Sequence, residues 1–296
     1  MIDYPALAAL AEIIRRGSFE GAAHALGITQ PAVSQRIRGL EARMGQILLD
    51  RGPPVTATPA GQRLIAHYDQ VRLLETGLEG YAAARQEPAT VRIAVNADSL
   101  ATWAMAALPA APGLLDLVID DQDHAEKWLR GGLVVAAITA GRGPVAGCDS
   151  HALGAMRYLA TASPQFMRQY FPDGLTPEAL GRAPALRFNS KDALQDRWAA
   201  RVTGRPAALP FHLIPDTRSF AQATILGMGW GMNPEALIAD DLAAGRLVCM
   251  GDEAALMVPL FWQVTRVMAP ALAPFSRALR RAGAATLWPV AAAEKP

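Results

Sequence analysis

The residues best suited to chemistry share one face of a helix that the sequence predicts over residues 30–44. Pro31, Ser34, Gln35 and Arg38 recur on this face, which carries short hydrogen-bonding groups and one cation. Such side chains can recognise the edges of DNA bases, because an amide pairs with adenine, a guanidinium with guanine and a hydroxyl with either bases or phosphate. Any amphipathic helix has a polar face, so the spacing alone leaves both interpretations open.

The opposite face of this helix is apolar at helical spacing, and we expect Val33, Ile37, Leu40 and Met44 to lie in a core. The chain before the helix must hold it against other elements. A first helix is predicted from about Pro5 to Arg16, followed by a shorter, alanine-rich one.

Local signals mark where these helices begin and end. Ser18 suits the N-cap of the second helix, and Gly27 suits the left-handed residue that follows its end. Thr29 then caps the third helix, with Pro31 in its first turn. Helix, three-residue turn and helix is the spacing of a helix-turn-helix. Residues 46–51 and 54–57 can add two short strands as a β-wing.

The segment as a whole resembles the LysR-type transcriptional regulators. The matching strings are Gly17-Ser18-Phe19, Ala22-Ala23-His24-Ala25-Leu26, Thr29-Gln30-Pro31-Ala32-Val33-Ser34-Gln35-Arg36-Ile37, Leu40-Glu41, Leu48-Leu49-Asp50-Arg51 and Thr58-Pro59-Ala60-Gly61. The resemblance implies base contacts from Gln30, Ser34, Gln35 and Arg38, and phosphate contacts near Ser18, Arg51 and Thr58. This chain departs from the family at Leu48-Leu49, where Leu-Phe is usual, and at Pro53-Pro54, which place no basic residue at the wing tip.

A long helix is predicted over residues 58–86, with Thr58 as N-cap and Pro59 at its first position. Over this length it would span roughly 40 Å. Two apolar positions recur every seven residues, as in a two-stranded helical interface: Leu64, Val71 and Leu78, and His67, Leu74 and Tyr81. The stripe can pair two copies of the chain on a two-fold DNA site, or it can pack on its own protein.

Beyond Pro88, short apolar strands alternate with helices, a pattern typical of parallel βαβ units. Strands are expected at 91–95, 114–120, 133–139 and 156–161, and a helix at 100–108. The predicted fold class is α/β overall, with a winged helix-turn-helix, a linker helix and a two-lobed domain that resembles the periplasmic-binding-protein-like effector domain of the same family. The expected division is 1–57, 58–87 and 88–296, with lobe I at 88–161 and 268–296 and lobe II at 162–267.

Two polar loops follow predicted strands of this domain, where ligands of such sheets bind. The first holds Asn96, Asp98 and Ser99, with Thr102 one turn later, at a helix start that suits a carboxylate. The second holds Asp121 and Asp123, which repel each other unless a cation is near. Together they predict an acidic pocket for a cationic ligand. Helix capping by Asp98 and Asp123, and a solvated acidic loop, remain alternatives.

Further strings resemble the subfamily that senses lysine or arginine and controls export of basic amino acids. They are Asn96-Ala97-Asp98-Ser99-Leu100-Ala101-Thr102-Trp103, Asp121-Gln122-Asp123-His124, Gly147-Cys148, Leu153-Gly154-Ala155-Met156-Arg157-Tyr158 and Gly227-Met228-Gly229-Trp230-Gly231-Met232. The resemblance implies double-stranded DNA, a lysine or arginine effector, a homodimer or tetramer, and RNA polymerase as partners. A regulator of another metabolic gene with a different effector is the alternative.

Composition narrows the remaining classes. The chain has 296 residues, 51% of them hydrophobic, and a formal net charge of +1. We find no apolar stretch long enough for a membrane helix and no secretion signal, so we expect a cytoplasmic protein that does not partner a membrane. Cys148 and Cys249 are expected to be small buried side chains, and no metal or cofactor is predicted.

Two other functions were weighed against regulation. An enzyme is disfavoured because no Gly-x-Ser-x-Gly elbow, His-Glu-x-x-His motif or phosphate loop is present. A solute-binding protein of a transport system would share the two-lobed fold, but it would need an export signal and would not need the first 87 residues.

Overall fold

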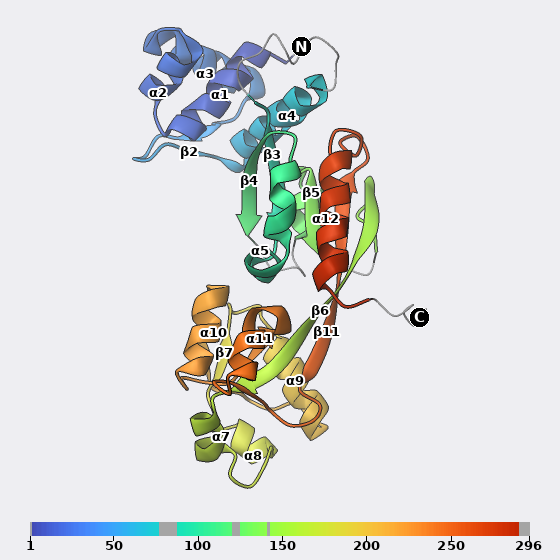
Figure 1. The fold of residues 1–296 in the computed structure, drawn as a ribbon. Coiled ribbons are helices and arrows are strands. Elements are labelled where there is room, and N and C mark those ends of the chain that lie inside the picture. The colour runs from blue at the N-terminus through green and yellow to red at the C-terminus, as the bar shows by residue number, and fades with distance from the viewer. Residues whose placement is uncertain (1, 77–87, 120–124, 141–142, 290–296) are drawn as a thin grey trace.

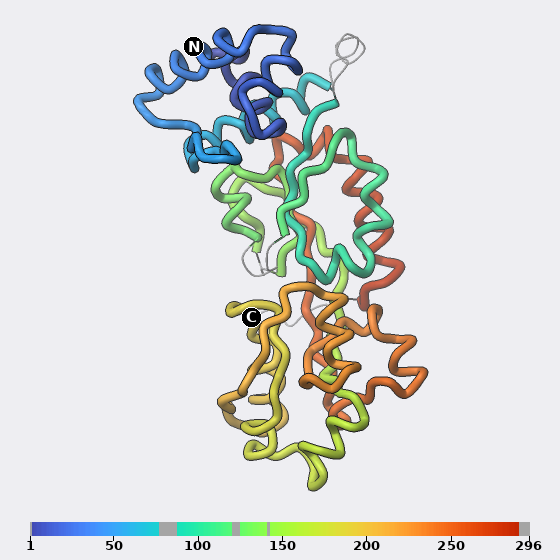
Figure 2. The backbone as a smooth tube through the Cα atoms, turned by 90° about the vertical axis from the view of Figure 1, so that its left-hand side faces the viewer, coloured from blue at the N-terminus to red at the C-terminus, as the bar shows by residue number. Residues whose placement is uncertain are grey.

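The computed structural model describes residues 2–76, 88–119, 125–140 and 143–289. Three parts follow one another along the long axis of the molecule: a helical N-terminal domain, a first α/β lobe and a second α/β lobe (Figure 1). The polypeptide runs from the first lobe to the second and back, and the last helix lies on the first lobe (Figures 1 and 2). Within this part of the chain, no helix is both long enough and apolar enough to cross a membrane.

The N-terminal domain contains three helices and a two-stranded wing. Its elements are α1 (Tyr4–Arg16), α2 (Phe19–Leu26), α3 (Gln30–Met44), β1 (Leu49–Asp50) and β2 (Thr56–Ala57). The Ser18 hydroxyl caps α2 by accepting the Gly21 N–H at 3.0 Å, and the Thr29 hydroxyl caps α3. Gly27 adopts φ 64° after α2, a conformation that favours glycine. These local signals therefore set the helix-turn-helix as predicted.

The core of this domain takes one face of each helix. Val33, Ile37 and Leu40 are buried as expected, against residues of α1 and α2. Met44 was also expected in the core, but it is 45% exposed. It is the last residue of α3, and Gly45 then turns the chain away in a left-handed conformation, so no element covers the Met44 side chain.

Helix α4 (Pro59–Glu75) belongs to two cores at once. Its first half packs Leu64, Ile65 and Tyr68 on the N-terminal domain, whereas Leu73 is fully buried in the core of the α/β lobes. The helix therefore connects the two cores without an intervening loop. The rest of the predicted linker helix, including Leu78 and Tyr81, lies outside the described residues.

Buried charge also joins α4 to the N-terminal domain. Arg15 of α1 forms ion pairs with Glu12 of the same helix and with Asp69 of α4. Glu12 and Asp69 are only 5% and 8% exposed. Burial raises the pKa of the Asp69 carboxyl, and the Arg15 guanidinium opposes that shift. This pair holds α1 and α4 in one relative orientation, because a buried charge that loses its partner is costly.

The large sheet is shared between the lobes. Its strands in spatial order are β10, β6, β11, β5, β3 and β4, and β9 also pairs with β6. Strands β3 (Thr90–Val95), β4 (Leu114–Ile119) and β5 (Ala136–Thr139) are parallel, as predicted for βαβ units. The long strands β6 (Cys148–Ala162) and β11 (Ala255–Thr265) are antiparallel and cross from one lobe to the other (Figure 1).

Helices cover the first lobe. The helix expected over 100–108 is instead two elements, α5 (Ala97–Thr102) and the 3-10 helix η2 (Ala104–Ala110). Pro109 disfavours an α conformation at the residue before it, which accounts for the tighter turn. The lobe is completed by α6 (Glu126–Arg130) and α12 (Ala273–Thr286).

The second lobe is built on the far ends of β6 and β11. Its elements are α7 (Pro164–Tyr170), α8 (Pro177–Leu180), β7 (Ala185–Arg187), α9 (Leu194–Thr203), β8 (Phe211–Leu213), α10 (Thr217–Ile225), β9 (Gly231–Pro234), α11 (Glu235–Ala243) and β10 (Val248–Cys249). Strands β7 and β8 form a separate parallel pair, whereas β9 and β10 pair with β6. The crossing takes place inside β6 and β11, and the division of the chain into lobes stays a prediction.

The two cysteines differ from the expectation in one case. Cys148 is 3% exposed, but Cys249 is exposed. Cys249 lies on β10, the outermost strand at its end of the sheet, where no neighbouring strand covers it.

Gly61 tests the close packing of α4 on the wing. A Cβ added there would lie 2.2 Å from the Leu48 carbonyl oxygen, which is backbone and cannot move freely. We expect Gly61→Ala to lower the free energy of unfolding of the N-terminal domain by about 1–3 kcal/mol. Gly39→Ala is the control, because no atom lies within 4 Å of its added Cβ. Thermal unfolding that leaves Gly61→Ala as stable as Gly39→Ala would contradict the packing described.

Candidate DNA interface and effector cavity

The polar face of α3 is open to solvent. Pro31, Gln35 and Arg38 are exposed and Ser34 is half-buried, while Gln30 is exposed at the first position of the helix. Within the described part of the chain, the side chains of Gln35 and Arg38 make no hydrogen bond or ion pair. These side chains are therefore free to bind an external partner, and the helix offers them in one row.

The predicted phosphate contacts surround this helix but also have structural tasks. The Ser18, Thr29 and Thr58 hydroxyls each accept a backbone N–H at a helix start. Thr58 also donates to the Ile47 carbonyl at 2.9 Å. Arg51 lies 3.5 Å from Glu41 and keeps 59% of its side chain exposed. Base and phosphate roles for these residues stay predictions.

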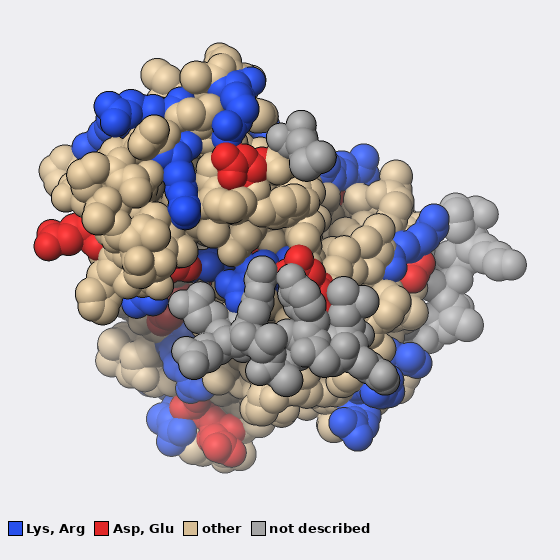
Figure 3. All heavy atoms as spheres, turned by 90° about the horizontal axis from the view of Figure 1, so that it is seen from above, with Lys and Arg blue, Asp and Glu red and all other residues tan. Residues whose placement is uncertain are grey.

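The surface of the N-terminal domain is basic around α3. Figure 3 looks onto this end of the molecule and shows Lys and Arg side chains outnumbering acidic ones there. Exposed arginines of the domain are Arg15, Arg16, Arg38, Arg43, Arg51 and Arg63. Such a surface attracts the phosphate backbone independently of sequence. The excess is confined to residues 30–51, where Arg36, Arg38, Arg43 and Arg51 outnumber Glu41 and Asp50.

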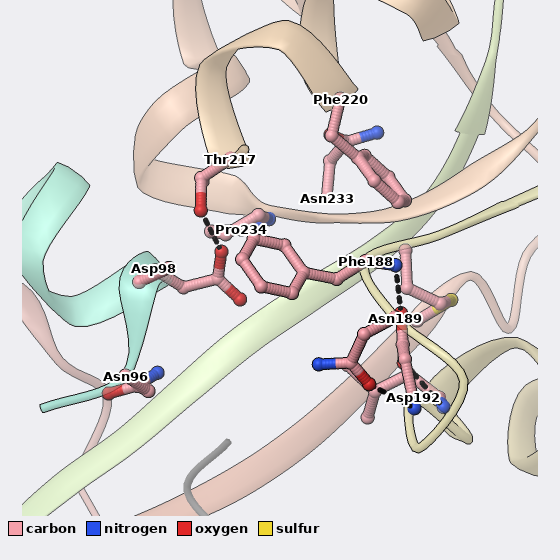
Figure 4. Close-up of a pocket in the computed structure, with 12 residues that line it drawn as sticks. Asn96, Asp98, Phe188, Asn189, Asp192, Thr217, Phe220, Asn233 and Pro234 are labelled. Carbon is pink, nitrogen blue, oxygen red and sulfur yellow. Dashed lines mark hydrogen bonds between the residues drawn. The ribbon is translucent and has the colours of Figure 1, made fainter. Parts of the chain in front are cut away.

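A cavity that is open to solvent lies between the two lobes (Figure 4). Its volume, including the solvent at its mouth, is about 550 Å³. The first lobe contributes the start of α5. The second lobe contributes the loop that follows β7, the start of α10 and strand β9. The lining residues are Asn96, Ala97, Asp98, Phe188, Asn189, Asp192, Leu194, Thr217, Phe220, Met232, Asn233 and Pro234.

Asp98 joins the lobes across this cavity. Its Oδ1 accepts a hydrogen bond from the Thr217 hydroxyl of the second lobe at 2.7 Å, drawn in Figure 4. Its Oδ2 accepts one from the Tyr158 hydroxyl of the crossing strand β6, also at 2.7 Å. Asp98 therefore does not cap α5 with its side chain. It supplies negative charge to the cavity and a direct contact between the lobes.

Buried amide groups in the wall of the cavity have unfilled hydrogen-bonding capacity. Asn96 is 2% exposed, and neither polar atom of its side chain has a partner among the residues that the structure describes. Asn233 donates to Thr161 and Thr224, which leaves its Oδ1 without a partner. A buried polar atom without a partner costs about 1–3 kcal/mol. A ligand with suitable polar groups would recover part of this free energy.

A second carboxylate faces the cavity from the second lobe. Asp192 accepts the Phe188 N–H at 2.9 Å and the Leu194 N–H at 3.1 Å, which fixes the loop after β7. Sequence analysis missed Asp192, Asn189 and Thr217. They follow strands β7 and β8, so the rule that ligands bind at the carboxyl ends of strands could have found them.

Two of the predicted effector residues do not line this cavity. Ser99 is fully buried, and its hydroxyl accepts the indole N–H of Trp103 at 3.2 Å. Thr102 donates to the Asp98 carbonyl at 2.6 Å and lines a different cavity. The Ser99 side chain points away because the next residue along a helix lies on a different face from Asp98, whereas Thr102 shares the face of Asp98 but lies one turn further along α5, beyond the cavity. Asp121 and Asp123 lie outside the described residues.

Comparison with known proteins decides the family. The profile of the bacterial regulatory helix-turn-helix proteins of the lysR family matches residues 5–62. The profile of the LysR substrate-binding domain matches residues 84–284. The chain belongs to the LysR family of transcriptional regulators. It is accordingly a DNA-binding regulator with an effector-binding domain.

Relatives of this LysR-type regulator match over nearly the whole length. It is 42% identical to the transcriptional regulator ArgP of Pseudomonas fluorescens Pf0-1, covering 98% of this chain and 100% of that protein. It is 42% identical to the regulator LysG of Mycobacterium bovis, covering 95% and 93%. These curated relatives are regulators of transcription.

Solved structures agree with the fold. ArgP from Mycobacterium tuberculosis matches with a TM-score of 0.78 at 41% identity, covering 98% of this chain and 100% of that one. Full-length LysG from Corynebacterium glutamicum with bound effector Arg matches with a TM-score of 0.65 at 34% identity, covering 97% and 100%.

Arg38 tests base recognition by α3. Replacing Arg38 by Ala should weaken binding to a selected DNA site by about 1–3 kcal/mol and relax preference at one base position. Arg43→Ala is the control. Arg43 lies in the same helix as Arg38, but its guanidinium pairs with Asp3, the N-cap of α1, at 2.7 Å. Binding-site selection followed by quantitative gel shifts would measure both effects. An equal loss on selected and random DNA would point to a phosphate contact instead.

Proposed function

We propose that this regulator senses a basic amino acid, lysine or arginine, in the cavity between its lobes. The main support for this proposal is that two carboxylates, Asp98 and Asp192, line one cavity from opposite lobes. A ligand with two cationic groups can pair with both, whereas a ligand without them would bring no cation to two half-buried carboxylates.

The remaining wall suits the rest of such a ligand. The rings of Phe188 and Phe220 can contact an aliphatic stem or the face of a cation. The unpaired Asn96 amide can receive the ligand carboxylate through its N–H groups, or an ammonium through its oxygen. Each carboxylate oxygen of Asp98 can accept a further hydrogen bond beside that from Tyr158 or Thr217, so a ligand cation at Asp98 would bind directly at a contact between the lobes.

The relatives support this ligand class. The Corynebacterium LysG structure carries Arg as bound effector. By similarity we infer that lysine or arginine changes the affinity of this regulator for DNA, and that a gene for amino-acid export is its target in the cytoplasm. RNA polymerase is the expected further partner. The proposed role involves no catalysis.

We also propose that the regulator is a homodimer, or a tetramer built from dimers, joined through α4. The buried side of this helix carries Ala66, Asp69 and Leu73. The predicted seam lies on the other side, where Val71 is half-buried and Leu74 is 41% exposed. Leu64 packs partly on its own domain. A second copy would cover the seam and place two DNA-binding helices on a two-fold site.

Isothermal titration with a panel of amino acids tests the effector. We expect the wild-type protein to bind lysine or arginine, and Asp98→Asn and Asp192→Asn each to weaken binding about ten- to a hundredfold, because charge-assisted hydrogen bonds are worth about 1.5–3 kcal/mol. Asp123→Asn is expected to act in the same direction. Asp173→Asn, an exposed acid of the second lobe, is the control. Tight binding of a neutral or acidic metabolite alone would refute the ligand class and leave the regulator intact.

Sedimentation velocity tests the dimer. The double change Val71→Asp and Leu74→Asp places two charges in the seam, where burying an unpaired charge costs several kcal/mol. We expect this variant to sediment as a monomer at micromolar concentration and to lose affinity for two-fold DNA. An unchanged dimer would show that another surface joins the copies.

A further inference from the structure

A second contact between the lobes lies beside the crossing strand β6. The pairing of β6 with β11 shifts register between Leu260 and Phe261, opposite Gly154. Gly154 has φ 136°, and a Cβ there would lie 2.6 Å from the Leu287 Cβ. The backbone therefore admits the segment that follows α12 to within contact of β6 at this point.

That segment is fixed on β6 through its backbone. The Trp288 N–H donates to the Ala155 carbonyl at 2.9 Å, and the Ala155 N–H donates to the Trp288 carbonyl at 2.7 Å. Leu287 packs on the main core. The end of α12, a helix of the first lobe, is thus tied to the crossing strand beside the irregularity (Figure 1).

The Trp288 side chain continues to the second lobe. Its indole N–H donates to Oε2 of Glu235, the first residue of α11, at 3.0 Å. Arg157 of β6 pairs with Oε1 of the same Glu235, and its guanidinium lies 5.2 Å from the centre of a Trp288 ring. We call Arg157, Glu235 and Trp288 the hinge clasp. It joins three elements that meet where the lobes do.

Two elements connect the hinge clasp to the effector cavity. Asn233 and Pro234 line that cavity, and Glu235 follows them directly in the chain. Pro234 also lines a second cavity at the clasp, together with Thr102 at the end of α5. Helix α5 begins in the effector cavity at Asn96 and Asp98, so both α5 and the β9–α11 junction reach from one site to the other.

We propose that the hinge clasp holds the lobes in the arrangement in which Asp98 contacts Thr217, and thereby sets the affinity for the effector. This inference rests on the proposed function. Its residues are positioning residues, because they do not line the effector cavity. A ligand bound between two lobes needs both in place, and its apparent affinity falls with the fraction of molecules in that arrangement. Weakening a contact of that arrangement therefore weakens binding from a distance.

Trp288→Phe is the sharpest variant, because it removes the indole N–H and keeps an aromatic ring beneath Arg157. We expect it to raise the Kd for lysine or arginine about fivefold, mainly through faster dissociation, as loss of one hydrogen bond worth about 1 kcal/mol implies. Glu235→Gln, which removes the charge opposite Arg157, should act in the same direction. Trp128→Phe is the matched control: Trp128 also lies by an arginine, Arg92, but within the first lobe.

The measurements are calorimetry and stopped-flow dissociation on the full chain, with thermal unfolding and DNA affinity without ligand as checks on folding. Both checks should match wild type. A Kd for Trp288→Phe that is unchanged, lower than wild type, or no higher than that of Trp128→Phe would overturn the proposal.

A readout that needs no ligand separates this inference from the effector assignment. Spin labels at the exposed positions Met105 in the first lobe and Leu226 in the second, in a Cys249→Ser background, report the separation of the lobes. Trp288→Ala should broaden the distance distribution and displace its main peak, whereas Trp128→Ala should not. Identical distributions would overturn the clasp even if lysine binds. Failure of wild type to bind lysine or arginine would sink only the effector assignment.

Discussion

The antiparallel pairing of β6 with β11 is the constraint on which the effector domain depends. Their register runs from Ala255 opposite Leu159 to Thr265 opposite Cys148, so one ladder passes through both lobes. Strand β5 adds to it in the first lobe, and β9 and β10 add to it in the second. The lobes cannot separate without breaking this ladder, but they can bend about it. The effector cavity and the hinge clasp both lie at this crossing, and Pro234 lines a cavity at each.

Helix α4 connects the DNA-binding domain to the effector domain by packing on both. Because Leu73 is buried in the lobes' core and Leu64 packs on the N-terminal core, the helix is part of both bodies. An ion pair between Arg15 and the buried Asp69 favours one orientation of α1 on α4. A regulator acts only if its ligand distinguishes two states. The packing of α4 on both cores connects the first lobe to the domain that carries the polar face of α3.

The polar groups buried in the effector domain differ in how fully they are satisfied. Gln263 bonds the Val145 N–H and the Thr139 hydroxyl, and Ser99 accepts the Trp103 indole, as expected of structural groups. Asn96 and Asn233, which line the effector cavity, retain unused atoms. Among the described residues, Gln195 and Trp230 also keep an unused buried atom but do not line the cavity, so the ligand role of Asn96 and Asn233 is supported by their place in its wall together with their unused atoms.

Local signals in the sequence determined the N-terminal domain, because a cap such as Ser18, Thr29 or Thr58 acts on backbone groups only three residues away. The helix-turn-helix and the open face of α3 followed from these signals. The parallel strands of the first lobe followed from the alternation of strands and helices along the chain. The effector site did not, since Asp192 and Thr217 lie far from Asp98 in the chain and only the crossing of β6 and β11 brings them together. The exposure of the Ser99 and Cys249 side chains was likewise decided by the tertiary structure. Helix rotation buries the Ser99 hydroxyl and an edge strand exposes the Cys249 thiol, and both depend on which neighbours the tertiary fold supplies.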